Sequence, residues 1–278
     1  MSSVPAGSDE VRRVRLDAEL VRRGLARSRD HAAELIHAAR VTVAGQVATK
    51  PATAVDPAAP VIVRADVADE NWASRGAHKL IGALDAFDSV VVSGARCLDA
   101  GASTGGFTDV LLRRGAREVV AVDVGYGQLI WRLQSDPRVA VIDRTNVRSL
   151  AADDIGGPVD LTVADLSFIS LRVVLPALVT CTDPAGDLLL MVKPQFEVGK
   201  DRLGAGGVVR DPELRIDAVR GVLAAAAESG HGVAGIVASP LPGPSGNVEY
   251  FVHVRAGVDR EAAEVEAAVR AAVAEGPQ

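Results

Sequence analysis

The sequence predicts an α/β protein in which a mainly parallel, doubly wound sheet follows a small α+β domain. Two observations indicate this: strand-like and helical segments alternate over most of the chain, and its first part places short helices before short strands. The length of 278 residues suits one large and one small domain. The composition, 48% hydrophobic and 24% charged, is ordinary for a globular protein, and no apolar run is long enough to span a bilayer.

Residues 1–10 are expected to form a disordered leader, because they lack the basic start and apolar stretch of a secretory signal. Cys97 and Cys181 lie in or beside apolar segments without metal-ligand neighbours. Buried free thiols and no metal site are therefore expected. These features favour a cytoplasmic protein without stable membrane association.

Residues 11–70 are expected to form the small domain. Apolar residues at helical spacing around Leu16 and Leu35 predict two short helices, and Ser28 can cap the second. Alternating valines after residue 40 predict short strands around a turn at Gly45 and Gln46. A linker at residues 71–74 leads into the large domain, residues 75–278.

Charge is distributed unevenly along the chain. Residues 11–50 carry nine Lys or Arg against four acids, a net +5, whereas the whole chain carries −6. A basic module on an acidic body suggests that the module binds the phosphates of a polyanion, although a solvated basic face is the alternative. The residues expected to make these contacts are Arg13, Arg15, Arg22, Arg23, Arg27, Arg29 and Lys50.

This module resembles a known family. Residues 15–17 (RLD), 24–29 (GLARSR) and 41–51 (VTVAGQVATKP) are similar to the S-four RNA-binding domain. The resemblance covers about fifty residues and implies binding to structured RNA through the two-helix face. Charge alone does not exclude DNA.

The large domain contains seven strand-like segments separated by helical ones. Ligands of doubly wound sheets bind at the carboxyl ends of the strands, so residues that follow each strand are the candidates for function. The expected strands are residues 96–99, 118–124, 139–143, 159–165, 188–193, 233–239 and 249–254.

Residues 98–108 (LDAGASTGGFT) are typical of a strand end, a tight glycine loop and a helix start, which together can hold a nucleoside cofactor. Gly101 and the pair Gly105 and Gly106 do not match the dinucleotide spacing, so NAD is disfavoured. Asp99 can meet a cationic group, which suits S-adenosylmethionine better than a pyrophosphate. A glycine-rich turn without a ligand is the alternative. The expected cofactor contacts here are Asp99, Gly101, Ser103, Thr104, Gly105, Gly106 and Phe107.

Two further residues are expected at this cofactor. Asp123 follows the second strand, where a carboxylate can accept hydrogen bonds from both ribose hydroxyls of a nucleoside. An Asp that only stabilises the loop or caps a helix is the alternative. After the third strand, Asn146 is favoured over Asp143 as the contact to an adenine edge.

Four charged residues make up the candidate catalytic set. Asp165 ends the fourth strand and Lys193 the fifth, so neighbouring strands bring them together, and partial burial can favour the neutral amine that base chemistry needs. Lys79 lies on an amphipathic helix that begins near residue 74, and Glu249 opens the last strand. Each residue alone is better explained by structure, for example a salt bridge, but the set of four favours catalysis.

The ordered set resembles the FtsJ-like Rossmann methyltransferases, which methylate ribose 2′-hydroxyls of RNA. With the basic module, the chain is similar to the TlyA family from about residue 13 to 255. The segments that carry the resemblance are residues 74–80, 98–108, 122–129, 164–171, 192–197 and 246–251. It implies S-adenosylmethionine-dependent 2′-O-methylation of cytidine in small- and large-subunit ribosomal RNA, with ribosomal subunits or their RNA as partners and, in the family, sensitivity to capreomycin and viomycin.

Within that chemistry, Lys193 is expected to act as general base or to stabilise the alkoxide, with Asp165 positioning it. Lys79 and Glu249 are expected to hold the ribose and balance charge. Asp165 also borders the expected cofactor site.

The sequence also bears on three other functions. A membrane-active protein is suggested by the hemolysin label of some relatives, but residues 261–275 carry small apolar residues and mixed charge rather than Trp or Phe. An RNA-binding protein with an inactive methyltransferase fold is disfavoured because all four charged residues are present. A base-modifying enzyme is disfavoured because no Asn-Pro-Pro-Tyr type of motif follows the fourth strand.

Overall fold

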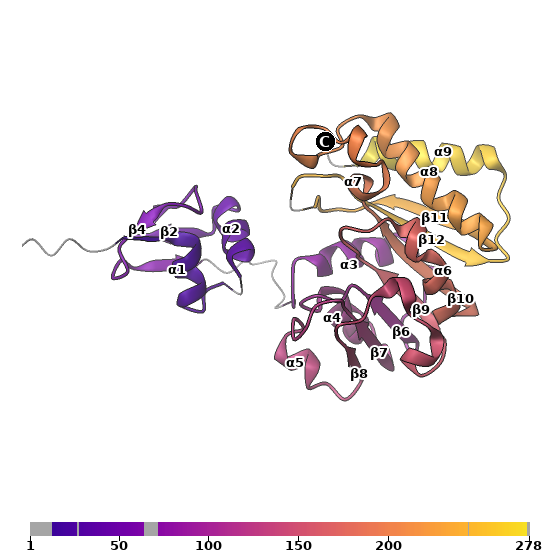
Figure 1. The fold of residues 1–278 in the computed structure, drawn as a ribbon, viewed down its shortest axis with the longest axis horizontal. Helices are drawn as coiled ribbons and strands as arrows, with labels where there is room; N and C mark the ends of the chain where they lie inside the picture. The colour runs from indigo at the N-terminus through magenta and orange to yellow at the C-terminus, as the bar shows by residue number, and fades with distance from the viewer. Residues whose placement is uncertain (1–12, 27, 64–71, 244, 277–278) are drawn as a thin grey trace, which may run out of the picture. The chain divides into compact units, whose positions relative to one another are not determined.

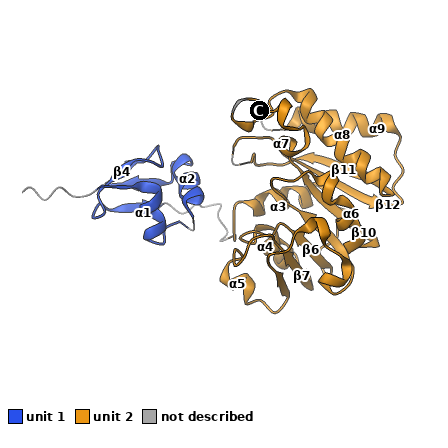
Figure 2. Cartoon of the chain, in the orientation of Figure 1, with its two compact units in different colours: residues 1–71 blue, residues 72–278 orange. Residues whose placement is uncertain are grey.

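In a computed structural model of the chain, the structure describes residues 13–26, 28–63, 72–243 and 245–276. The chain divides into two compact units, residues 1–71 and 72–278 (Figure 2). The expected leader at residues 1–10, Arg27 and the first linker residue, Asn71, lie outside the described residues.

The first unit has two short helices packed with short strands. Its core holds apolar side chains of both helices and of β2 and β4, and Ser28 Oγ accepts a hydrogen bond from His31 N at 3.1 Å to cap α2. The hairpin turn is formed by Ala44 and Gly45, both at positive φ, so the expected turn at Gly45 and Gln46 is wrong by one residue. The elements are β1 (Val14–Arg15), α1 (Leu16–Arg22), α2 (Arg29–His37), β2 (Val41–Val43), β3 (Gln46–Val47), β4 (Ala54–Val55) and β5 (Val61–Val63).

The second unit contains a seven-stranded sheet in the order β11-β12-β10-β9-β6-β7-β8. All pairs are parallel except those made by β12, which runs antiparallel to both its neighbours. This confirms the predicted mainly parallel α/β sheet. The strands are β6 (Arg96–Ala100), β7 (Glu118–Val122), β8 (Val139–Ile142), β9 (Val159–Ala164), β10 (Thr182–Val192), β11 (His231–Ala238) and β12 (Tyr250–Ala256).

Helices cover both faces of this sheet (Figure 1). Side chains of α3 (Gly76–Ala86), α4 (Gly106–Arg113) and α5 (Trp131–Gln134) pack on one face with alternate strand residues such as Cys97 and Leu189. Side chains of α6 (Leu171–Cys181), α8 (Pro212–Glu228) and α9 (Ala262–Glu275) pack on the other face with Leu98 and Leu190. Successive strand residues thus point to opposite faces, and both faces are buried.

Short helical turns complete the unit: α7 (Pro194–Glu197) and four 3₁₀ turns, Val147–Ser149, Ala152–Ile155, Lys200–Arg202 and Ala205–Gly207. Within the described ranges, no helix has the length and apolar character needed to cross a membrane.

Candidate functional site

The four charged residues form two ion pairs at the carboxyl edge of the sheet. Lys193 Nζ lies 2.6 Å from Asp165 Oδ1, and Lys79 Nζ lies 2.5 Å from Glu249 Oε2. The first pair is the more accessible one, with side-chain exposures of 9% and 23% against 6% and 1%. The Gln195 side-chain amide donates to Glu249 at 3.5 Å, so the turn that follows Lys193 also reaches the second pair.

The sheet topology places these residues together. Ala164 pairs with Leu190 in the parallel β9–β10 ladder, so Asp165 and Lys193 both follow at the same edge. Tyr250 pairs with Val192, and because β12 is antiparallel to β10, the residue that precedes β12 lies at the edge that β10 reaches last. The strand β12 begins at Tyr250, so Glu249 lies one residue before it, whereas the sequence predicted that Glu249 would be the first residue of the strand.

Residues that the sequence analysis did not assign complete the surroundings of Lys193. Ser167 Oγ accepts a hydrogen bond from Lys193 Nζ at 3.1 Å. The neighbouring Phe168 is 91% exposed and has a φ of 64°, and its ring centroid lies 5.3 Å from that of Phe196. Both Ser167 and Phe196 lie within three residues of an assigned residue, so proximity in sequence was the available signal.

The two ion pairs can support chemistry in which an oxygen atom loses a proton and gains negative charge. Two ammonium groups face two carboxylates, so the set is balanced, and the pairing offsets the cost of burying each charge. A lysine held in this way can stabilise negative charge that develops on a nearby oxygen, or accept its proton as the neutral amine.

The glycine loop is packed tightly against its surroundings. Gly101 and Gly105 have φ values of 89° and 100°, a region that favours glycine. A Cβ at Gly101 would lie 2.7 Å from the Asp165 carbonyl oxygen, and one at Gly105 would lie 2.3 Å from the Leu133 side chain. Protein packing therefore requires these two glycines whether or not a ligand binds.

Asp99 is fully buried beneath this loop. Its Oδ2 accepts a hydrogen bond from Thr108 Oγ1 at 2.6 Å, and its Oδ1 has no hydrogen-bond partner among the described residues. Burial raises the pKa of Asp99 to about 7, and the nearby Asp165 carboxylate adds to this, although the Thr108 hydroxyl opposes it. A buried carboxyl oxygen without a partner fits a cationic ligand group.

The other expected cofactor residues hold the loops in place. Half-buried Asp123 accepts hydrogen bonds from Ser103 N at 2.8 Å and Gly125 N at 2.7 Å. Asn146 is exposed, and its Oδ1 accepts from Arg148 N at 3.0 Å, which caps a 3₁₀ turn.

Three loop residues complete that set. The Thr104 carbonyl accepts a hydrogen bond from Ile130 N at 3.2 Å. A Cβ at Gly106 would lie 2.2 Å from Ser74 Oγ. The Phe107 ring is buried in the core beside Phe251, so only its backbone remains for a ligand.

Acidic side chains within the first unit pair with several of the predicted RNA-contacting arginines. Asp17 Oδ2 lies 2.8 Å from Arg15 Nη2 and 3.1 Å from Arg29 Nη2, and these partners hold the pKa of Asp17 down at about 2. Glu19 pairs with Arg22 at 2.5 Å and with Arg23 at 2.7 Å, and its pKa is likewise lowered to about 2.

Exposure separates these basic side chains. The paired side chains of Arg15, Arg22 and Arg29 remain more than half exposed. Arg23 is only 21% exposed and donates to the carbonyls of Pro57 and Ala59, so it supports the fold. Arg13 and Lys50 are exposed, and Arg27 lies outside the described residues.

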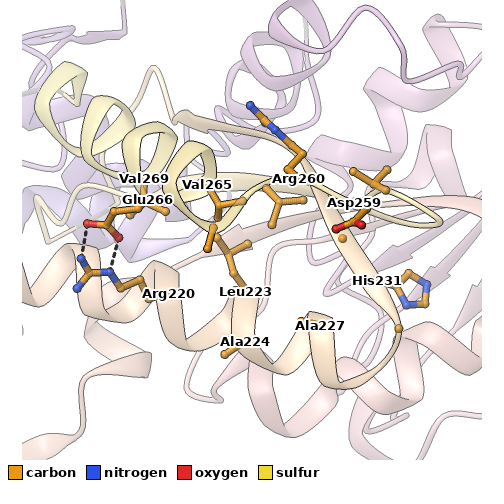
Figure 3. Close-up of a pocket in the computed structure, with 15 residues that line it drawn as sticks. Arg220, Leu223, Ala224, Ala227, His231, Asp259, Arg260, Val265, Glu266 and Val269 are labelled. Atoms are coloured by element: carbon orange, nitrogen blue, oxygen red, sulfur yellow. Dashed lines mark hydrogen bonds and ion pairs between the residues drawn. The ribbon is translucent and has the colours of Figure 1, made fainter.

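A cavity of about 490 Å³ lies apart from this charged set (Figure 3). It is lined by residues of α8, α9 and the start of β11, including Leu223, Val265 and His231. Because β11 and β10 are both antiparallel to β12, they run in the same direction, and His231 begins β11 at the edge opposite to the one that Lys193 follows. Among the described residues, no group of three or more His, Cys, Asp or Glu side chains is placed to hold a metal ion.

Two family models match the chain. Residues 72–256 match the FtsJ-like methyltransferase, and residues 14–61 match the S4 domain. The first match includes all four residues of the charged set, and the second lies within residues 11–70, the expected small domain.

Individual relatives are similar over nearly the whole chain. The 16S/23S rRNA (cytidine-2′-O)-methyltransferase TlyA of Mycobacterium tuberculosis is 60% identical over 96% of this chain and 99% of its own length. Hemolysin A of Brachyspira hyodysenteriae is 33% identical over 86% of this chain and 99% of its own length. The solved structure of a "putative hemolysin from Streptococcus thermophilus" is 33% identical, covers 95% of this chain and 96% of that one, and has a TM-score of 0.75.

Proposed function

The chain belongs to the TlyA family of FtsJ-like methyltransferases, and from this we propose that it methylates the ribose 2′-hydroxyl of cytidines in 16S and 23S ribosomal RNA. The observation that carries the proposal is the pair of lysine–carboxylate contacts at the carboxyl edge of the sheet, beside the glycine loop. Ligands of doubly wound sheets bind at this edge.

The residues at the glycine loop fit S-adenosylmethionine, the cofactor of this methyltransferase family. This cofactor supplies an electrophilic methyl group on a sulfonium sulfur. The buried Oδ1 of Asp99 suits its cationic amino acid end, and the carboxylate of Asp123 suits its ribose hydroxyls, since a carboxylate can accept more bonds than the two from backbone N–H groups. Asn146 is our candidate for the adenine edge.

Lys193 is the residue that we assign to the reacting hydroxyl. As the neutral amine it takes the proton of the 2′-hydroxyl, and as the ammonium it offsets the negative charge that develops on that oxygen. Asp165 and Ser167 hold Nζ from two sides, at 2.6 and 3.1 Å. The more deeply buried Lys79–Glu249 pair is assigned to holding the ribose and keeping the site balanced in charge.

The basic first unit is proposed to anchor the RNA. Its exposed side chains Arg13 and Lys50 suit phosphate contacts, which give affinity without sequence specificity, and so do Arg15, Arg22 and Arg29, which are more than half exposed. Ribosomal subunits or their RNA are thus the proposed partners, without stable membrane association or a bound metal, and the proposed location is the cytoplasm.

The substrate is tested with ribosomal subunits and naked ribosomal RNA that lack the modification. Labelled methyl transfer is measured and the 2′-O-methyl positions are mapped. We expect the wild type to methylate cytidine riboses, and absence of transfer to every subunit and RNA would contradict the proposed substrate. Leakage of liposomes caused by the pure protein would instead favour the membrane-active alternative.

The assignment of Lys193 is tested in the same assay with Lys193→Ala. Methyl transfer should be lost while the affinity for S-adenosylmethionine changes by less than about twofold, because Lys193 acts on the acceptor oxygen rather than on the cofactor. Lys200→Ala, which changes an exposed lysine seven residues on, is the matched control and should retain activity. Full activity of Lys193→Ala refutes the assignment.

A further inference from the structure

Glu197 is a buried carboxylate close in sequence to Lys193 that the reaction as described does not use. It ends the single-turn helix α7, four residues after Lys193, and is 5% exposed. A carboxylate buried this deeply requires hydrogen-bond donors or a positive charge beside it, and for Glu197 these come from the start of α6.

The carboxylate of Glu197 binds the start of α6. Its Oε1 accepts from Leu171 N at 2.7 Å, and its Oε2 accepts from Ser170 Oγ at 2.5 Å and Arg172 Nε at 3.2 Å. The Glu197 carbonyl also accepts from Arg172 Nη2 at 2.9 Å. A negative charge at the first turn of an eleven-residue helix is favourable because it satisfies backbone donors there.

The turn after β10 also contacts the connection between β9 and α6 at a second place, Lys193. Residues 165–170 connect β9 to α6, and they contain both groups that hold Lys193 Nζ, Asp165 at 2.6 Å and Ser167 at 3.1 Å. Lys193 and Glu197 lie at the two ends of the turn that follows β10. The two contacts therefore close a ring of covalent and non-covalent links, with Lys193 at one junction and Glu197 at the other.

The turn between Lys193 and Glu197 couples the positions of these two residues. Pro194 fixes the backbone at the first position of α7, and the hydrogen bonds from Phe196 N to the Lys193 carbonyl at 2.8 Å and from Val198 N to the Pro194 carbonyl at 3.1 Å hold the turn closed. A shift of Glu197 relative to α6 thus changes the direction in which the Lys193 side chain leaves the backbone.

We propose that Glu197 is a positioning residue that holds the Lys193 ammonium against Asp165 and Ser167 by fixing the turn after β10 to the start of α6. The consequence for catalysis rests on the proposed function, in which Lys193 acts on the reacting hydroxyl. Glu197 itself does not touch the substrate in this proposal.

The first test measures the position of Lys193 without requiring activity. The full-length wild type and Glu197→Gln are treated briefly with acetic anhydride, and acetylation of individual lysines is followed by peptide mass spectrometry. Gln keeps the size of Glu but places an N–H₂ group where one oxygen accepted from N–H and O–H donors. Lys79, which is buried to a similar degree at 6% side-chain exposure against 9%, is the internal reference.

We expect Lys193 in Glu197→Gln to be acetylated about tenfold faster than in the wild type, with the Lys79 rate unchanged. Equal acceleration of both lysines would mean that Glu197 only supports the fold, and no acceleration would mean that it does not hold Lys193. Either result overturns the proposal. This outcome is independent of the substrate, so a failure of the proposed function leaves the test intact.

The second test separates kcat from KM in methyl transfer to ribosomal RNA. Glu197→Gln should lower kcat by about 10- to 100-fold, because a misplacement of about 1 Å at a reacting group has an effect of this size, while KM for the RNA and for S-adenosylmethionine stays within about twofold. Asp211→Asn, which alters the carboxylate that caps α8 through the Glu213 amide, is the control and should leave kcat unchanged. An unchanged kcat in Glu197→Gln contradicts the proposal.

Discussion

The buried carboxyl group of Asp99 leads to a prediction about cofactor binding and pH. Its Oδ1 has no partner among the described residues, and burial raises its pKa to about 7. A carboxylate that pairs with the ammonium of S-adenosylmethionine must be ionised, so the protonated form must release its proton on binding. Affinity for the cofactor should therefore fall as the pH falls below 7.

The size of the effect follows from one-proton linkage. With a pKa of about 7, the ionised fraction of Asp99 falls from about three-quarters at pH 7.5 to about 3% at pH 5.5, so the dissociation constant should rise by about 25-fold between these values. The amino group of the ligand remains mostly protonated over this range and contributes little to the change.

Isothermal titration of S-adenosylmethionine between pH 5.5 and 7.5 measures this dependence. Asp99→Asn should bind more weakly and lose the dependence on pH. Thr108→Val removes the hydroxyl that lowers the Asp99 pKa, so it should move the midpoint to higher pH. A wild-type affinity that does not change with pH, or a slope that persists in Asp99→Asn, would refute the reasoning.

Three further predictions concern stability and RNA affinity. Gly101→Ala combines a positive φ with a Cβ 2.7 Å from a backbone oxygen and should lower the free energy of unfolding by about 3 kcal/mol, whereas Gly127→Ala, also at positive φ but with nothing within 4 Å, should cost about 1 kcal/mol; equal losses in denaturant melts would contradict this. Asp17 and Glu19 have pKa values of about 2, below their ordinary values of 3.8 and 4.5, so the stability that they give the first unit is present above about pH 4.5 and is lost towards pH 2. Circular dichroism of the isolated first unit is the measurement, and the unit that carries both Asp17→Asn and Glu19→Gln should lose less helical signal on acidification than the unchanged unit. Lys50→Ala should reduce the salt slope of RNA binding by about one with an unchanged melting temperature, and an unchanged slope would remove Lys50 from the interface.

Most strand positions could be predicted from the sequence because buried strands carry continuous apolar runs bounded by turn residues, but the order of the strands, with β12 inserted between β10 and β11, could not. The start of β10 could not, since Thr182 lies six residues before the apolar run at Leu188 and the intervening residues include Asp183 and Gly186. The pairing of Thr182 with Val159 extends this strand, and such a tertiary contact leaves no periodic signal. The hairpin turn differed by one residue because Ala44 adopts a positive φ that its type does not favour.

At the site, the sequence indicated that Asp165 and Lys193 meet, but not that Lys79 and Glu249 form a second ion pair with each other. Lys79 and Glu249 are 170 positions apart, and their contact depends on the antiparallel direction of β12. The glycine loop was predicted as a ligand contact, and its spacing did not reveal that Gly101 is also required by the close approach of the Asp165 carbonyl. Glu197 ends one of the segments that carry the family resemblance, residues 192–197, but the sequence did not reveal its role, because a buried acid and a solvated one look alike in a sequence.

The position of β12 between β10 and β11 has a consequence for how the enzyme is made. Until residues 250–256 have been synthesised, β11 has no strand to pair with, and β10 remains an open edge whose unpaired backbone groups can pair with other chains. The Lys79 ammonium, already surrounded by α3 and the sheet, also lacks its carboxylate until Glu249 arrives. The last strand therefore completes both the sheet and the second ion pair. A chain that stops before it is expected to be both inactive and prone to aggregate.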